Sequence, residues 1–376
     1  MRNPEPLALT VTVCRDDARF GALAADWRDL YDHCRSVTPF QSHAWLYSWW
    51  LSYGTPGRLR VVLVHRADGR LVAAAPLCRV PGPLPALTLL GGAVTDYGDV
   101  LVDDGCPEAV PALAGALAGL ARTAVIDLRE VRPGSAAERV HAAWRGPRRR
   151  LADSTRLELP ALPLDQLVRR LPSSRAQQVR AGLRKIDREG VEERHVPAAE
   201  VPGALRHLLR LHRRRWAGRR VNPELLTDRF AEHLARAVGA MAHAGQARVT
   251  EFRLDDDLVA ADLTLVSPRL TGGYLYGADP VLRSLKVDVT TLLLASASRR
   301  DGDGSRGALS LMRGEEQHEH HWSPEAVRNE RLLLARRRTA PALWLRAGYA
   351  GGRRWAADRL RARRNCRRFG NGPRPA

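Results

Sequence analysis

The sequence predicts an α/β protein made of two similar units, each with a mixed central sheet flanked by helices, and an arginine-rich C-terminal tail. Three observations support this fold class. Each half of the chain contains two apolar runs joined by a short polar turn, which is the pattern of a β-hairpin. Val-Ala-Ala recurs in the second run of each hairpin, at residues 72–74 and 259–261. Helices and strands follow in the same order in both halves, which indicates a duplicated unit.

The overall composition is that of a globular protein. The chain has 376 residues, of which 44% are hydrophobic and 27% charged, enough for two domains of ordinary size. No run approaches the ~20 apolar residues of a membrane span, and the N-terminus lacks the layout of a signal peptide. We therefore expect a cytoplasmic protein without a transmembrane segment. The five cysteines form no Cys-x-x-Cys pair, which argues against a disulfide framework and a cysteine-type zinc site.

The first unit is predicted to cover residues 1–162. Ser42 is a helix N-cap residue, and the helix after it carries Trp45, Trp49 and Trp50, which we expect to pack in the core or between the units. The Ala-Asp-Gly-Arg turn at residues 67–70 marks the first hairpin. The expected elements are a strand at 7–14, a helix at 18–34, the hairpin at 59–79, short strands at 87–90 and 100–102, a helix at 108–121 and a strand at 124–128.

The second unit is predicted to cover residues 163–340. Its first helix ends at Gly190, and Ser323 followed by Pro324 is typical of a helix start. The expected elements are helices at 173–189, 205–216, 227–244 and 287–300, strands at 191–195, 273–276 and 308–312, a hairpin at 247–267 and a helix from Pro324.

The C-terminal tail, residues 341–376, dominates the charge of the chain. The net charge is +19, and the segment from Arg331 to the end holds 14 arginines against one acid, Asp358. Only Lys185 and Lys286 are lysines, so the abundance of arginine partly reflects composition bias. A basic segment of this kind suits a nucleic acid such as tRNA, an anionic membrane surface that is contacted peripherally, or an acidic partner.

A series of short motifs resembles a known family. These motifs lie between Phe40 and Trp322 and read PFQSHAWLYSWWLSYG, DGRLVAAAPL, TDYGD, LHRRRW, YLYGADP and RGEEQHEHHW. In this order they resemble the acetyltransferase family associated with cellulose biosynthesis, which is related to Fem-type aminoacyltransferases. The order of helices and strands resembles the GNAT acyltransferase fold, so the resemblance implies two tandem GNAT-like domains, with the active centre in the second.

The function that this resemblance implies is N-acyl transfer to an amine. The acceptor would be a small molecule, a sugar or an amino-acid-like compound, and acyl-CoA is the favoured donor and co-substrate. The alternative is a Fem-like transferase that forms an amide bond from aminoacyl-tRNA. A further alternative is a non-catalytic GNAT-like binding protein. No metal is expected in any of these readings.

The resemblance also indicates where the donor binds. The strand GYLYGADP would lie beside the acyl group, and the N-terminus of the next helix would face the donor phosphates. Relatives carry Ser-Pro-Gly where this chain has Ser284-Leu285-Lys286, so the glycine that allows close approach to phosphate is missing. We predict that Arg283, Ser284 and Lys286 bind the donor, with the two cations compensating for the glycine.

Six further residues are predicted to bind substrate. Asp96, Tyr97 and Asp99 match a family motif and would recognise the acceptor amine, or would form a hydrogen-bonded turn. Tyr274 and Tyr276 alternate on one strand, and there they would pack in the core or donate to a leaving thiolate or ribose oxygen. Asp262 interrupts an apolar strand, which is costly unless the carboxylate is paired or functional.

The stretch LMRGEEQHEHHWSP, residues 311–324, contains the predicted catalytic residues. Glu315 or Glu316 would orient the amine, and His318 or His320 would accept its proton, because histidine titrates near neutrality. A metal site formed by His318, His320 and His321 and a solvated loop without chemistry are the alternatives. No hydrolase nucleophile elbow, P-loop or dinucleotide-binding glycine motif occurs in the sequence.

Overall fold

One mixed sheet runs through the whole molecule. The computed structural model describes residues 8–216, 222–301, 307–312 and 319–350. Within these residues the sheet has 13 strands in the order β1-β2-β3-β4-β6-β13-β7-β12-β11-β10-β9-β8, with β5 beside β3. The strands are β1 (Leu9–Cys14), β2 (Leu59–Arg66), β3 (Leu71–Val80), β4 (Ala86–Leu89), β5 (Leu101–Val102), β6 (Val125–Val131), β7 (Arg148–Pro160), β8 (Glu192–His195), β9 (Ala247–Leu254), β10 (Asp257–Val266), β11 (Leu270–Ala278), β12 (Ala308–Ser310) and β13 (Glu325–Leu334).

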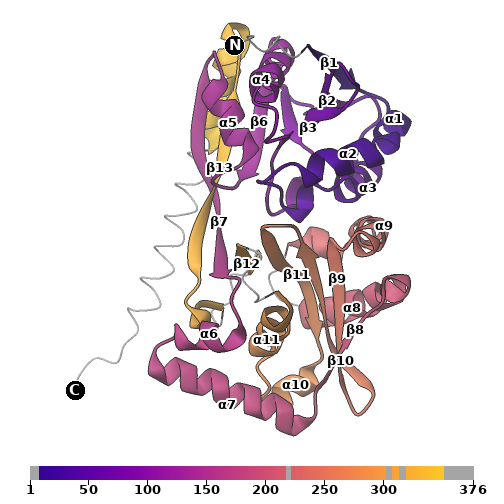
Figure 1. The fold of residues 1–376 in the computed structure, drawn as a ribbon, viewed down its shortest axis with the longest axis vertical. Coiled ribbons are helices and arrows are strands. Elements are labelled where there is room, and N and C mark those ends of the chain that lie inside the picture. The colour runs from indigo at the N-terminus through magenta and orange to yellow at the C-terminus, as the bar shows by residue number, and fades with distance from the viewer. Residues whose placement is uncertain (1–7, 217–221, 302–306, 313–318, 351–376) are drawn as a thin grey trace, which may run out of the picture.

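The helices of the first unit cover both faces of its part of the sheet (Figure 1). Ser42 accepts a hydrogen bond from the Trp45 backbone N–H at 3.3 Å, which confirms the predicted cap. The single helix predicted at 18–34 is instead two helices, which meet at Leu23. The helices are α1 (Asp17–Ala22), α2 (Ala24–Asp32), α3 (His43–Tyr53), α4 (Ala109–Leu120) and α5 (Ala136–Ala143), with 3-10 turns η1 (Pro39–Gln41) and η2 (Gly92–Val94).

The helices of the second unit repeat this arrangement. Helix α7 ends at Gly190, whose φ of 71° is the left-handed conformation expected of a glycine C-cap. The helices are α6 (Leu164–Arg169), α7 (Ser173–Glu189), α8 (Val201–Trp216), α9 (Asp228–His243), α10 (Pro280–Ser284) and α11 (Val289–Asp301), with 3-10 turns η3 (Ala198–Glu200), η4 (Pro223–Leu226), η5 (Glu319–Trp322) and η6 (Arg337–Thr339).

Alternation along the strands produces separate cores on the two faces of the sheet. Val61 and Leu63 of β2 pack toward α1, α2 and α3, whereas Val62 and Val64 pack toward α4 and α5. The first of these clusters continues into the second unit, where it contains Phe230 of α9. The two units therefore share one hydrophobic core, built where α3 packs against α9.

Strand β13 crosses back into the first unit, which corrects one prediction. A helix was predicted from Pro324, but residues 325–334 form a strand between β6 and β7. Ser323 has a φ of 52°, so it does not take the extended conformation of an N-cap residue. Hydrogen bonds to strands on both sides override the helical propensity of the segment. Strand β7 links the units, because it pairs with β13 over most of its length and with β12 at its end (Figure 1).

The first part of the predicted tail is a helix that packs on the first unit. Residues 340–350 are helical, and Leu343 is fully buried against Val125, Leu333 and Ala335. The rest of the tail, residues 351–376, lies outside the described residues. No helix in the described ranges is long and apolar enough to cross a membrane.

Candidate active site

The two strands β11 and β12 separate within the second unit. They pair in parallel only between residues 270–272 and 308–310, although β11 continues to Ala278. After Ser310 the chain stays beside β7, with which β12 pairs, and the Leu311 N–H donates to the Leu157 carbonyl at 2.9 Å. A Cβ atom on Gly272 would overlap the Met312 side chain, so a larger residue there would force that side chain to move. We call the point where the strands part, after Gly272 and Ser310, the fork.

Helix α8 holds Tyr276 on the part of β11 that extends beyond the fork. Arg215 Nη2 donates to the Tyr276 hydroxyl at 2.7 Å, and the guanidinium carbon lies 4.8 Å from the ring centroid. His212 Nδ1 bonds the Tyr276 carbonyl at 2.8 Å, so this nitrogen carries the hydrogen. Burial lowers the pKa of His212, which keeps the imidazole neutral. The side chain and the backbone of Tyr276 are therefore both fixed by α8.

Tyr274 has a different environment from Tyr276. Its hydroxyl donates to the Val94 carbonyl of the first unit at 2.7 Å, and its ring contacts Phe40 and Trp45 edge-on. The pairing register between β10 and β11 shifts between Leu263 and Thr264, so that Leu263 lies opposite Leu275 whereas Thr264 lies opposite Gly273. The two tyrosines that the sequence places on one strand therefore have different roles: Tyr274 packs in the shared core, whereas Tyr276 lies against α8.

Asp262 lies directly opposite Tyr276 in the β10–β11 pairing. Its side chain is buried and accepts a hydrogen bond from Thr264 Oγ1 at 2.6 Å. Burial raises the pKa of this carboxyl to about 6, against a weaker opposing effect of Thr264 and Arg248. The buried Asp262 carboxyl, on β10 in the second unit's part of the sheet, thus has a pKa closer to neutrality than an ordinary aspartate.

The predicted donor-binding residues surround the start of α11. Arg283 and Ser284 end α10, and together with Lys286 they are exposed to solvent. Lys286 has a φ of 58°, which is the left-handed conformation that favours glycine. Asp288 accepts a hydrogen bond from the Thr291 N–H at 3.1 Å and so caps α11. The lysine thus adopts a backbone conformation that favours glycine, and it adds a positive charge beside the helix N-terminus.

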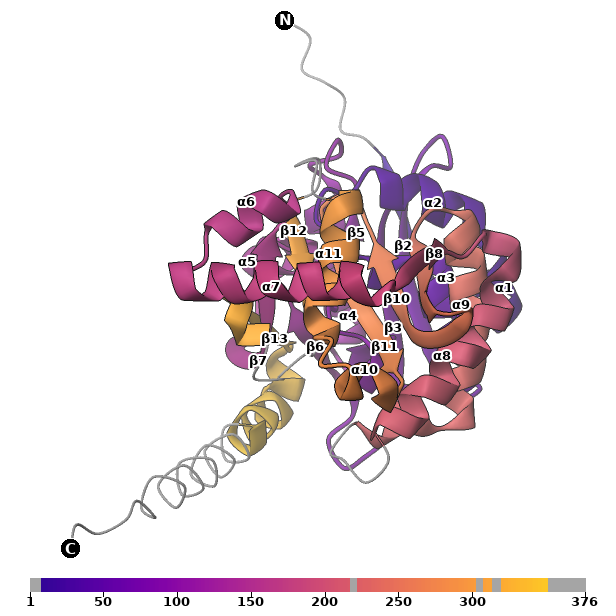
Figure 2. The same ribbon diagram turned by 90° about the horizontal axis from the view of Figure 1, so that it is seen from below.

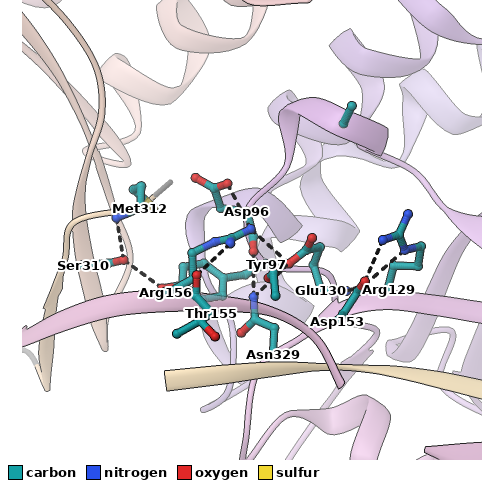
Figure 3. Close-up of polar contacts among 12 residues, drawn as sticks. Asp96, Tyr97, Arg129, Glu130, Asp153, Thr155, Arg156, Ser310, Met312 and Asn329 are labelled. Carbon is teal, nitrogen blue, oxygen red and sulfur yellow. Dashed lines mark hydrogen bonds and ion pairs between the residues drawn. The ribbon is translucent and has the colours of Figure 1, made fainter. Parts of the chain in front are cut away.

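Tyr97 connects the first unit to the fork. Its hydroxyl donates to Glu158 Oε1 at 2.9 Å. The same hydroxyl lies 2.8 Å from Ser310 Oγ, which in turn accepts from the Met312 N–H (Figure 3). Arg132 binds both oxygens of Glu158, at 2.9 and 2.6 Å. Burial and the charge of Glu158 raise the pKa of Tyr97. We call Tyr97, Arg132, Glu158 and Ser310 the junction network.

Asp96 belongs to a second buried polar group. Arg156 lies between two carboxylates, 3.4 Å from Asp96 and 3.0 Å from Glu130 (Figure 3). The Asn329 side chain on β13 donates at 3.1 Å to the Asp96 carbonyl and to Glu130. Asp96, Arg156 and Asn329 are all buried. This group fixes the position of β13 between β6 and β7, and the Asp96 carboxylate is already paired within it.

Asp99 supports a helix start. Its carboxylate accepts from the backbone N–H groups of Ala136 and Ala137 at 3.0 and 2.7 Å, and from Ser36 at 3.1 Å. Burial raises its pKa to about 6 in spite of these donors. Asp99 also lines a cavity of about 120 Å³ between the units, together with Tyr97, Arg35, Arg132 and Arg269.

The predicted catalytic loop lies mostly outside the described residues. Glu315, Glu316 and His318 fall outside the described residues, and His320 is described only as part of the η5 backbone. Their catalytic roles remain predictions. Within the described ranges, no cluster of three or more His, Cys, Asp or Glu side chains could hold a metal ion.

Several residues at these sites were not predicted from the sequence. Arg132, Glu158 and Ser310 lie far apart along the chain, and nothing in their neighbours marks them. The segment LHRRRW is one of the family motifs, but from the sequence alone the presence of His212 in it is explained by helical packing. Its hydrogen bond to a strand carbonyl depends on how α8 lies against β11, which local sequence does not reveal.

The comparisons with known proteins agree with this architecture. Residues 173–320 match the model of the acetyltransferase (GNAT) domain family. Solved structures with a similar fold include the C-terminal domain of a putative lysylphosphatidylglycerol synthetase from Agrobacterium fabrum, at 12% identity and a TM-score of 0.55, covering 88% of this chain and 95% of that one. FemX is similar at 10% identity and a TM-score of 0.57, covering 86% and 96%.

A third similar structure is a conserved protein of unknown function from Bacteroides thetaiotaomicron VPI-5482, at 11% identity and a TM-score of 0.59, covering 87% of this chain and 100% of that one. No curated protein sequence matches the chain. At these identities the likeness establishes the fold alone. The protein is thus an α/β protein of two tandem GNAT-like units, and its second unit carries the match to the acetyltransferase domain.

Proposed function

We propose that this protein is an N-acyltransferase, which moves an acyl group from an activated donor to an amine. The observation that carries the proposal is the fork between β11 and β12, in the unit that matches the GNAT domain, with Tyr276 held by Arg215 beside it. We also propose that the chain is a member of the cellulose-associated acetyltransferase family, as its motifs suggest. Acyl-CoA and aminoacyl-tRNA are both cytoplasmic molecules, so we place the protein in the cytoplasm.

The donor in this proposal is an acyl-CoA bound along α10 and α11. Arg283 and Lys286 are exposed before the N-terminus of α11, where an anionic group is favoured by the helix dipole and by unpaired N–H groups. The Thr291 N–H already donates a hydrogen bond to Asp288 and is not available to the donor. The capped helix end attracts the donor phosphates only in part. The two cations therefore supply the additional attraction.

The chemistry requires one proton acceptor and one proton donor. The amine nitrogen attacks the acyl carbon, an amide C–N bond forms, and the C–S bond to the thiolate breaks. Glu315 or Glu316 would orient the amine, and His318 or His320 would take its proton. The Tyr276 hydroxyl, which Arg215 holds by a hydrogen bond, is the proton donor that we propose for the leaving thiolate.

The acceptor would bind where the two units meet. The cavity beside Tyr97 is lined by Arg35, Arg132 and Arg269, and of these only Arg132 forms an ion pair among the described residues. Asp96 and Asp99 are engaged by Arg156 and by backbone N–H groups. This distribution of charge favours an acceptor that carries a carboxylate or phosphate in addition to its amine, such as an amino-acid-like or sugar-phosphate compound.

A second candidate function is transfer from aminoacyl-tRNA. The observation in its favour is the basic face of α8, where Arg206, Arg210, Arg213 and Arg214 are exposed at positions that share one side of the helix. The same helix brings Arg215 to Tyr276, so a phosphate backbone bound on this face would lie near the fork.

Donor binding distinguishes the two candidates. Equilibrium dialysis with radiolabelled acetyl-CoA and filter binding with charged tRNA would each measure an affinity. We expect Lys286→Ala and Lys286→Gly both to weaken binding of the true donor about tenfold, since each removes the charge. Lys185→Ala is the matched control, because Lys185 pairs with Glu189 on α7. Binding of neither donor would overturn both candidates.

The loop is tested separately by single-turnover amide formation. Glu315→Ala and His318→Ala should each slow the reaction at least a hundredfold without changing donor affinity. His33→Ala serves as the control, since His33 is exposed in the first unit. Full activity in both loop variants would instead support the alternative that this segment is a solvated loop without chemistry.

A further inference from the structure

The helix at residues 340–350 exposes an uncharged face. Its exposed residues are Pro341, Trp344, Leu345, Gly348 and Tyr349. Their spacing of three, four, seven and eight places them on one side of the helix. Trp344, Leu345 and Tyr349 are 46%, 60% and 70% exposed, and they are three of the six large hydrophobic side chains that stand exposed in the described part of the chain. Apolar exposure is thus concentrated on one short helix, and we call this side its outer face.

The opposite side of the helix is anchored to the first unit. Leu343 is buried among Val125, Leu333 and Ala335. Arg346 Nη1 donates to Asp127 Oδ2 at 3.2 Å. These contacts fix the rotation of the helix about its axis, so packing against the protein turns the outer face toward solvent. Figure 2 shows the helix in gold at the margin of the molecule.

Arginines border the outer face. The Arg149 guanidinium carbon lies 4.0 Å from the centroid of the Trp344 ring, a cation–π contact. Arg337 and Arg338 are exposed immediately before the helix. The sequence that follows, residues 351–376, contains nine arginines and one acid, Asp358. Arg149 therefore borders the apolar face in space, and arginines precede and follow the helix in the sequence.

We propose that this helix attaches the protein peripherally to an anionic membrane surface. Tryptophan and tyrosine favour the boundary between headgroups and acyl chains, where a ring and a polar tip are both accommodated. An amphipathic helix lies in that plane with its apolar side inserted, and neighbouring arginines bind anionic headgroups. Nucleic acid fits the outer face less well, because the exposed positions of the helix carry no charge to meet phosphates.

Vesicle co-sedimentation of the full-length protein tests the proposal. We expect binding to phosphatidylcholine vesicles that contain phosphatidylglycerol, weak binding to phosphatidylcholine alone, and weaker binding at high salt. The triple variant Trp344→Ser, Leu345→Ser, Tyr349→Ser should lose at least tenfold in affinity. The double variant Arg337→Gln, Arg338→Gln should lose about fivefold per arginine.

The matched control is Val11→Ser with Leu51→Ser, at two other exposed hydrophobic positions, 44% and 49% exposed. This variant should bind vesicles like the wild type. Equal urea midpoints would show that all variants fold, as is expected of exposed positions.

Two further measurements test whether the outer face binds a second copy of the protein or RNA instead of a membrane. Sedimentation velocity of the wild type and the triple variant detects self-association, and filter binding with total tRNA detects RNA. Vesicle binding that is unchanged in the triple variant overturns the proposal. So does a triple variant that loses only dimerisation or only RNA binding.

Discussion

The hydroxyl groups of Tyr97 and Ser310 lie 2.8 Å apart, although the two residues are separated by 213 positions in the sequence. Tyr97 lies between the short strands β4 and β5 of the first unit, and Ser310 ends β12 at the fork. The contact lies between the arginine-lined cavity and the fork, and Glu158 and Arg132 hold it in place. A buried, charge-assisted network of this kind joins the two units beside the cavity that we propose for the acceptor.

Tyr97→Phe should destabilise the protein by about 1–2 kcal/mol, because a buried hydroxyl that serves two partners is removed while its partners stay buried. The free energy of unfolding in urea measures the loss. Tyr47→Phe is the control, since the Tyr47 hydroxyl forms no hydrogen bond within the described residues and should cost nothing measurable. Equal stability of the two variants would show that the junction network contributes little.

Arg156→Ala should cost about 3 kcal/mol or more. Arg156 is the counter-charge for Asp96 and Glu130, and its removal leaves two carboxylates in a buried site. The exposed pair of Arg169 and Asp165 provides the comparison, and Arg169→Ala should change stability by at most about 0.5 kcal/mol. Chemical denaturation of both variants at neutral pH measures the difference in stability. Similar losses in the two variants would contradict the conclusion that Arg156 neutralises buried carboxylates.

Asp262→Asn should change how stability depends on pH. The folded pKa of Asp262 is about 6, above its ordinary value of 3.8, so the folded state binds more protons between these values. The wild type should therefore lose stability as pH rises from about 4 to 6 and keep that loss above 6. The asparagine variant keeps the Thr264 hydrogen bond and lacks this slope, and above pH 7 it should exceed the wild type by about 1–2 kcal/mol.

Asp99→Asn is the informative contrast to Asp262→Asn. Its pKa is also raised to about 6, but both of its oxygens accept backbone N–H groups. An amide offers one acceptor oxygen in place of two, so this variant should lose about 1 kcal/mol at pH 7. Thermal unfolding of both variants across the pH range decides the matter. A stabilising Asp99→Asn would contradict its role at the start of α5.

Lys286→Gly should raise the free energy of unfolding by up to about 1 kcal/mol, because glycine adopts the left-handed conformation of this position without the strain of a side chain. Lys286→Ala keeps the strain and should leave stability nearly unchanged. A calorimetric comparison of the two separates backbone strain from charge, and it complements the donor-binding measurement, in which both variants should be weakened.

Much of the secondary structure could be predicted from local patterns. The caps at Ser42 and Gly190, both hairpins and the repeated Val-Ala-Ala follow from side-chain chemistry within a few residues of each other. The same reasoning failed at Pro324, where a Ser-Pro start and good helix formers indicated a helix. Strand β13 exists because β6 and β7 offer hydrogen bonds on both sides, and their distance in sequence hides those bonds from local patterns.

The sequence by itself determined the fold class, the duplication and the chemical types available for a site. Only the tertiary structure decided how those residues are used. Tyr274 and Tyr276 diverge because the β10–β11 register shifts, and Asp99 supports a helix because α5 begins beside it. Ser310 reaches Tyr97 because β7 spans both units. Hydrophobic period and capping are local properties of a chain, whereas a hydrogen bond between distant residues depends on which elements pack together.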